Sequence, residues 1–198
     1  MIAAATSLAE LPQAWTLPYR GKVGMACLII AESAIFTIFV VAYLFYIGKS
    51  LTGPTPQQVL ETPIFFTICL LSSSLTVHFA GKALERGKRG AFLILWSLTI
   101  LLGGLFLYGT GQEWHRLIYE HGLTISTNLF GTTYYSLVGL HAFHVTAGLV
   151  MLSIVLIFAL AGRVGADQFR RVDVLALYWH FVDAVWVVVF TVVYILGR

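Results

Sequence analysis

Five long apolar stretches alternate with short polar segments along this chain. A helix needs about 20 mostly apolar residues to cross the hydrocarbon core of a bilayer, and each stretch reaches roughly that length. The pattern therefore predicts an all-α, polytopic transmembrane bundle of five helices, in a single domain over residues 1–198. We expect a polar loop over residues 111–132 and spans at about residues 23–47, 62–80, 91–108, 133–161 and 174–196.

The composition agrees with a membrane protein. Hydrophobic residues make up 59% of the 198 positions and charged residues only 11%, whereas about a quarter of an ordinary soluble domain is charged. The excess apolar surface must face lipid or other subunits. The net charge of +3 comes from basic residues scattered over several loops, a pattern that does not favour a nucleic-acid partner. Cys27 and Cys69 form no Cys-x-x-Cys pair, which excludes covalent c-type haem attachment.

The basic residues are distributed unequally between the two sides of the predicted membrane. With five spans, the N-terminus shares a side with the second and fourth loops, and short cytoplasmic loops carry the excess of Lys and Arg. We therefore predict a cytoplasmic N-terminus and a C-terminus outside, in the periplasm. The cytoplasmic side then holds nine basic residues and the outer side three, namely Arg20, Lys22, Lys82, Arg86, Lys88, Arg89, Arg163, Arg170 and Arg171 against Lys49, Arg116 and Arg198.

Two acids fall inside predicted spans. Glu32 lies nine residues into the first span, roughly 14 Å deep at the rise of an α-helix, and Asp183 lies at a similar depth in the fifth. His180 precedes Asp183 by three residues and shares its helix face. Ionisable groups at this depth usually have a partner or a task. We expect them to form a polar layer inside the bundle, together with groups of the second span, namely Ser72, Ser73, Ser74, Thr76 and His78.

Each of these groups has more than one interpretation from the residues alone. Glu32 is either a protonated acid that hydrogen-bonds a neighbouring helix, since burial favours the neutral form, or a functional carboxyl. His180 and Asp183 either fix helix packing or act in a proton path. Trp179 and Trp186 are interpreted as packing aromatics, in the core or facing lipid, and not as part of a cofactor site.

Two histidines of the fourth span, His141 and His144, lie three residues apart on one helix face. This spacing also occurs among the metal ligands of helical bundles, but those sites add carboxylates from several helices. Carboxylates are few and isolated here, so we expect no metal site and assign both histidines to the polar layer.

Several stretches of the chain resemble subunit III of the haem–copper respiratory oxidases. An acidic motif at Leu28–Phe36, a Ser-rich segment at Leu70–Thr76 and the pair Glu113-Trp114 each look like a segment of that family. The fourth and fifth spans match its His-x-x-His-Val-x-x-Gly and Trp-His-Phe-Val-Asp-x-Val-Trp motifs, at Gly139–Gly148 and Tyr178–Trp186. The resemblance covers about Leu17 to the C-terminus, and five spans are typical of the short bacterial form.

The resemblance implies a non-catalytic core subunit of a proton-pumping terminal oxidase, the enzyme that reduces oxygen to water in aerobic respiration. Such a subunit holds no haem or copper; both belong to the catalytic subunit I, its main contact, and subunit II lies in the same complex. Its helices form two groups around a cleft that holds phospholipids. It stabilises the catalytic subunit and supports proton uptake. The implied location is the bacterial inner membrane, and membership of a respiratory supercomplex is left open.

The resemblance also assigns roles to individual residues. Glu32 matches the family's carbodiimide-reactive carboxyl, and with Asp183 it is expected in a proton path or beside the lipid cleft. Glu113 and Trp114 are expected to anchor the outer end of the third span. The partners expected in the polar layer are His180, His144, His141 and Ser73. The candidates for binding lipid headgroups at the cytoplasmic surface are Arg20, Arg86 and Lys88.

Alternative functions remain at this stage. One alternative is subunit III of a quinol oxidase, because the electron donors dock on other subunits, although the acid at position 32 favours the cytochrome c branch. Another is an accessory protein of a nitric-oxide reductase, which resembles this family and shares the five spans. A proton-coupled transporter that uses Glu32 and Asp183 would need discontinuous helices or repeated halves, and neither is evident in the sequence. A membrane metalloenzyme would need more ligands than the expected polar layer offers.

Overall fold

A computed structural model describes residues 19–197, and in this part of the chain all regular structure is helical. Five of its helical segments are long and apolar enough to cross a membrane, which confirms the predicted fold class. The elements are α1 (Arg20–Tyr46), α2 (Pro56–Val59), α3 (Ile64–Glu85), α4 (Arg89–Tyr119), α5 (Leu129–Leu160), η1 (Ala166–Gln168), α6 (Phe169–Phe190) and η2 (Thr191–Leu196). Residues 1–18 and 198 lie outside the described part, and so do the start of the family resemblance at Leu17 and the basic residue Arg198.

The ends of the predicted spans lie within five residues of the observed helix ends, except around the segment between the third and fourth spans. A polar loop was expected over residues 111–132, but α4 continues to Tyr119 and α5 begins at Leu129. The prediction was wrong because it equated the end of apolar character with the end of the helix. A helix can continue into the aqueous region where its residues favour helix and no proline interrupts it, and here it ends before Gly122, which has a φ of +62°.

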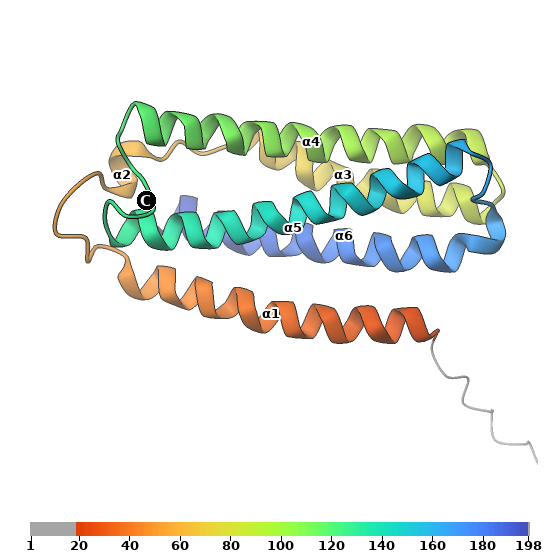
Figure 1. The fold of residues 1–198 in the computed structure, drawn as a ribbon, viewed down its shortest axis with the longest axis horizontal. Coiled ribbons are helices and arrows are strands. Elements are labelled where there is room, and N and C mark those ends of the chain that lie inside the picture. The colour runs from red at the N-terminus through yellow and green to blue at the C-terminus, as the bar shows by residue number, and fades with distance from the viewer. Residues whose placement is uncertain (1–18, 198) are drawn as a thin grey trace, which may run out of the picture.

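The helices are arranged in three layers (Figure 1). The pair α3 and α4 forms one outer layer, α5 and α6 form the middle layer, and α1 packs against α5 and α6 from the other side. Four helices thus form one group, and α1 lies beside it. We call the end of the bundle where α1, α4 and α6 begin the basic end, because Arg20, Lys22, Lys82, Arg86, Lys88, Arg89, Arg163, Arg170 and Arg171 lie at or near it.

Trp179 of α6 joins three neighbouring helices in the core. Its ring is fully buried, and its indole N–H donates a hydrogen bond to Oγ of Ser73 on α3 at 2.8 Å. A Cβ atom added to Gly103 on α4 or to Gly148 on α5 would lie 2.8 Å from the ring. The two glycines therefore leave the space that a large indole needs between α4 and α5.

Trp186 repeats this arrangement about two turns further along α6. Its N–H donates to Oγ1 of Thr67 on α3 at 3.1 Å, its ring meets Phe106 of α4 edge-on at 4.6 Å between centroids, and it stacks on His141 of α5 at 4.9 Å. Both tryptophans lie in the core, in agreement with the packing interpretation. Because each indole N–H has an acceptor, burial leaves no unpaired donor on either ring.

Gly87 and Asn128 define two of the helix ends. Gly87 adopts a φ of +70° after α3, and the next amide, of Lys88, donates to the carbonyl of Ala83, as in a glycine-terminated helix. Asn128 begins α5, where its Oδ1 accepts from the amide of Gly131 at 2.8 Å. Its Nδ2 also donates to the carbonyl of Thr52 in the loop after α1, which joins two loops at the end opposite the basic end.

The close approach at Trp179 gives a first prediction. Gly148→Ala places a methyl group against the indole, and overpacking of this kind costs about 1–3 kcal/mol. Thermal unfolding of the purified membrane protein should therefore show a lower midpoint for this variant. The matched control is Gly104→Ala, because a Cβ at Gly104 meets nothing within 4 Å. Equal midpoints for the two variants would contradict the role assigned to the glycines.

Candidate functional site

Glu32 and His144 form a pair between α1 and α5. Oε2 of Glu32 lies 3.1 Å from Nε2 of His144. Nδ1 of His144 lies 2.8 Å from the carbonyl oxygen of Leu140, and a carbonyl can only accept, so Nδ1 carries a proton. The bond to Glu32 then requires a second proton, on the carboxyl or on Nε2. The pair therefore holds one exchangeable proton and is neutral as a whole.

The surroundings of this pair are asymmetric. The side chain of His144 is 8% exposed and that of Glu32 is 22% exposed, and Phe36 packs against the imidazole at 5.0 Å between ring centroids. The hydroxyl of Tyr178 on α6 donates to the backbone carbonyl of His144 at 3.2 Å. The histidine is therefore fixed in the bundle, whereas the carboxyl lies near the surface of the isolated chain at bilayer depth.

An apolar groove of about 320 Å³ lies next to this pair, between α1 and α6. Its only polar side chains, Ser33 and Thr37, give their hydroxyl protons to carbonyls within α1, so the walls offer no free donor. The remaining lining residues are Phe36, Val40, Phe181, Ala184, Val185, Val188 and Val189. A groove of this composition fits a hydrocarbon chain and not a polar substrate.

Asp183, His180 and Ser74 form a second polar group, between α3 and α6. Oγ of Ser74 lies 2.7 Å from Nδ1 of His180. Asp183 is 3% exposed, and neither of its carboxyl oxygens has a hydrogen-bond partner among the described residues, although the Ser74 hydroxyl faces it. His180 thus links α6 to α3 through Ser74, whereas Asp183 makes no such link by its own carboxyl oxygens.

The expected single polar layer is in fact divided into separate contacts. Ser73 donates to the carbonyl of Leu70 at 2.5 Å and accepts from Trp179, so it belongs to the packing of α3 on α6. His141 is fully buried against Trp186, and neither of its ring nitrogens has a partner among the described residues. The layer prediction failed because equal depth along the membrane does not specify the direction in which each side chain points.

Glu113 and Trp114 lie near the end opposite the basic end, within the polar extension of α4. Oε2 of Glu113 accepts a hydrogen bond from the hydroxyl of Tyr194 at 2.8 Å. Trp114 packs edge-on against Tyr135 at 5.6 Å between centroids. These contacts connect α4 to η2 and to α5. Tyr194 was missed from the sequence, since it reaches Glu113 from the π-helical segment η2, which no sequence pattern indicated.

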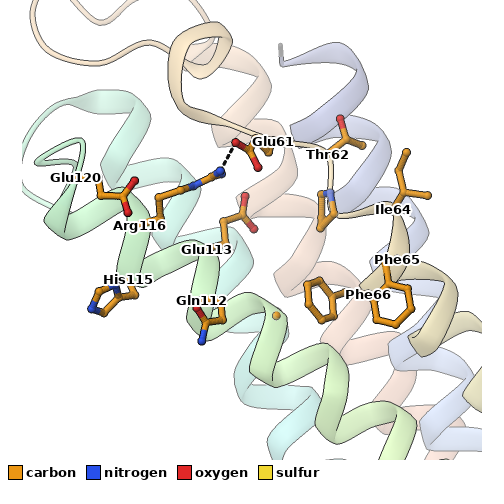
Figure 2. Close-up of a pocket in the computed structure, with 12 residues that line it drawn as sticks. Glu61, Thr62, Ile64, Phe65, Phe66, Gln112, Glu113, His115, Arg116 and Glu120 are labelled. Atoms are coloured by element: carbon orange, nitrogen blue, oxygen red, sulfur yellow. Dashed lines mark ion pairs between the residues drawn. The ribbon is translucent and has the colours of Figure 1, made fainter.

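A cavity of about 410 Å³ lies beside Glu113 (Figure 2). In the figure, Arg116 points to Glu61, and the two side chains form an ion pair. His115 points away from Glu113. Side-chain exposure is 77% for Glu61 and 22% for Arg116. Exposed pairs of this kind contribute about 0–1 kcal/mol, so the ion pair positions the loop before α3 more than it stabilises the fold.

The three headgroup candidates Arg20, Arg86 and Lys88 are all exposed at the basic end. Their neighbour Arg89 is engaged, because its guanidinium donates to the carbonyl of Ala159 at the end of α5 at 2.6 Å. Within residues 19–197, no group of three or more His, Cys, Asp and Glu side chains is arranged to hold a metal ion.

Comparison with known proteins gives one consistent family. The family model described as cytochrome c oxidase subunit III matches residues 16–198. The cytochrome c oxidase subunit 3 of Alkalihalophilus pseudofirmus is 34% identical over 189 residues, which cover 94% of this chain and 92% of that protein. The subunit 3 of Synechocystis sp. is 39% identical, over 87% of this chain and 74% of that protein. The cytochrome bo(3) ubiquinol oxidase subunit 3 of Pseudomonas aeruginosa is 32% identical, over 85% of this chain and 81% of that protein.

The position of Glu32 gives a second prediction. A lipid-soluble carbodiimide reacts with a protonated carboxyl, and Glu32 is the acid that lies both at bilayer depth and near the surface. Glu32→Gln should therefore abolish most labelling of this chain, measured by mass spectrometry of its peptides. Asp183→Asn is the control and should leave labelling intact, because Asp183 is buried. Undiminished labelling of Glu32→Gln would show that another carboxyl reacts.

Proposed function

Because this chain belongs to the cytochrome c oxidase subunit III family, we propose that it is a non-catalytic subunit of a proton-pumping terminal oxidase in the bacterial inner membrane. Its place as subunit III of a haem–copper oxidase and as a multi-pass bacterial membrane protein follows from the family and from the five spans. The match over residues 16–198 is the observation on which the proposal depends. In this proposal the complex reduces oxygen to water and this chain supports it.

The redox centres are proposed to lie in subunit I, with this chain holding none. Three of the four histidines within the predicted spans already have other neighbours, which supports this division: His144 pairs with Glu32, His180 with Ser74, and His141 packs on Trp186. Subunit I is proposed as the main contact and subunit II as a further member of the complex. Large apolar side chains exposed on the isolated chain, such as Ile94, Leu101 and Phe143, suit such contacts or lipid.

Phospholipid is proposed to occupy the groove between α1 and α6. Its apolar walls accept a hydrocarbon chain, and Glu32 and His144 lie beside it. Arg20, Arg86 and Lys88, which are exposed at the basic end, are proposed separately as ligands for lipid headgroups. We place this end at the cytoplasmic surface because Lys and Arg are concentrated there. In this account the lipid fills the space that α1 leaves open and supports α1 against the other four helices.

A quinol oxidase is the second candidate, because the relative from Pseudomonas aeruginosa carries that name. The electron donor docks on another subunit, so no residue of this chain separates the two. The sequence of the neighbouring subunit II distinguishes them, since ligands for a copper centre there indicate cytochrome c as donor and their absence indicates quinol.

The proposed division of labour is tested by purification. Extraction in mild detergent with an affinity tag on this chain should recover a large partner with haem absorbance and copper. The same tagged chain expressed without the oxidase genes is the control and should be colourless. Stoichiometric metal in the isolated chain would contradict a non-catalytic role.

The lipid groove gives a further prediction. Ala184→Trp fills it from α6, so the complex should lose bound phospholipid, measured by mass spectrometry of lipid extracts, and should inactivate several-fold faster during continuous turnover with an unchanged initial rate. Val187→Trp is the matched control, because Val187 is 47% exposed on the same helix and does not line the groove. Inactivation at the same rate in both variants would contradict the lipid site.

A further inference from the structure

Asp183 is a buried acid without a hydrogen-bond partner. It is 3% exposed, and both carboxyl oxygens lack a partner among the described residues. An unpaired buried polar group costs free energy, and an unpaired carboxylate costs far more than a neutral acid. A carboxyl in such a position therefore needs a proton, water molecules or both. They can reach it from the basic end of the bundle or from the opposite end.

Ser74 and His180 connect Asp183 towards the basic end. The Ser74 hydroxyl faces Asp183 and is bonded to Nδ1 of His180 at 2.7 Å. A hydroxyl can accept one hydrogen bond and donate another at the same time. Ser74 can thus accept from Nδ1–H of His180 while it donates to a carboxyl oxygen of Asp183.

The next group in this direction is a polar cavity. It has a volume of about 280 Å³, and its lining includes His78, Gly81 and His180. The rings of His78 and His180 lie 6.4 Å apart between centroids. A water molecule needs about 10–15 Å³ of such space and two or more polar partners, so the cavity has room for several waters. The charged groups that line it are Lys22 of α1, Lys82 and Glu85 of α3, and Asp173 of α6, which pairs with Lys22 at 2.7 Å.

Towards the opposite end of the bundle the core is closely packed. Leu70 of α3, Phe106 of α4 and Trp186 of α6 are each 0–1% exposed, and Phe106 and Trp186 are in direct contact. No cavity described in residues 19–197 joins Asp183 to the opposite end. On this side the indole N–H of Trp186 is already bonded to Oγ1 of Thr67, whereas His180 and Ser74 lead from Asp183 to a cavity.

We propose that a one-sided path for protons runs from the cavity at the basic end through His180 and Ser74 to Asp183. The juxtaposition of an unpartnered buried acid, a hydroxyl–imidazole bond and a polar cavity carries this inference. It rests on the proposed function for its setting, an oxidase complex in a membrane, and it gives the proton-uptake role a position within this chain.

The proton transfer balances without any further reactant. The starting state has His180 neutral with its proton on Nδ1, a Ser74 hydroxyl and an ionised Asp183. A hydronium ion in the cavity gives a proton to Nε2 of His180 and becomes water, the Nδ1 proton passes to Oγ of Ser74, and the original hydroxyl proton passes to a carboxyl oxygen of Asp183. The imidazole is then neutral with its proton on Nε2, and Asp183 is a neutral acid.

Infrared spectroscopy of the intact oxidase complex tests the path. The carbonyl stretch of protonated Asp183 is identified as the band that Asp183→Asn removes and Asp183→Glu shifts, and its shift in D₂O gives the rate of hydrogen exchange. Gly81→Leu should slow this exchange, because a side chain at Gly81 enters the cavity, where its Cβ meets only one atom, at 3.8 Å. Ser74→Ala should slow exchange by about tenfold, the equivalent of one lost hydrogen bond, and Ser74→Thr should restore it.

Gly90→Leu is the matched control, since a Cβ at Gly90 meets nothing within 4 Å, and exchange in this variant should equal that of the unmodified complex. If Asp183→Asn destabilises the complex, Asp183→Glu still identifies the band. Exchange unaffected by Gly81→Leu and Ser74→Ala, or the absence of any carbonyl band from Asp183, would overturn the path. Neither result bears on co-purification with haem and copper, so failure of the path and failure of the proposed function are distinguishable.

Discussion

The contact of Trp179 with two glycines is the constraint on which the rest of the bundle depends. An indole fits between α4 and α5 only because Gly103 and Gly148 carry no side chain, and its N–H fixes α3 through Ser73. In a bilayer, apolar burial does not drive helices together, so close packing and hydrogen bonds between helices must do so. One side chain here supplies both. Trp186, about two turns along the same helix, repeats the arrangement with Thr67, Phe106 and His141.

This packing determines where the polar groups can lie. The two tryptophans occupy the centre of the four-helix group, which leaves the acids on two separate sides of it. Glu32 meets His144 where α1 covers α5, and Asp183 faces Ser74 where α6 covers α3. The first acid lies beside an apolar groove and the second at the inner end of a polar cavity. The closely packed tryptophans between them separate the two acids.

Much of the fold could be predicted from the sequence, because membrane spans depend on local composition, which hydropathy reads directly. The family could be identified from the two His-containing motifs. The side-chain contacts could not. Glu113 was singled out, but its partner Tyr194 depends on the π-helical turn of η2, and the polar layer separated because helix rotation, not depth, decides which groups meet. Ser73 and His141 were assigned to that layer for their polarity, whereas each packs against a tryptophan.

The central claim is that this chain supports an oxidase without taking part in its redox chemistry. The most direct measurement compares the purified oxidase with and without this chain, for haem and copper content, initial rate of oxygen reduction and lifetime during turnover. The account predicts equal haem and copper, a similar initial rate and a much shorter lifetime in the depleted enzyme. Loss of haem or copper in proportion to the removal of this chain would contradict it.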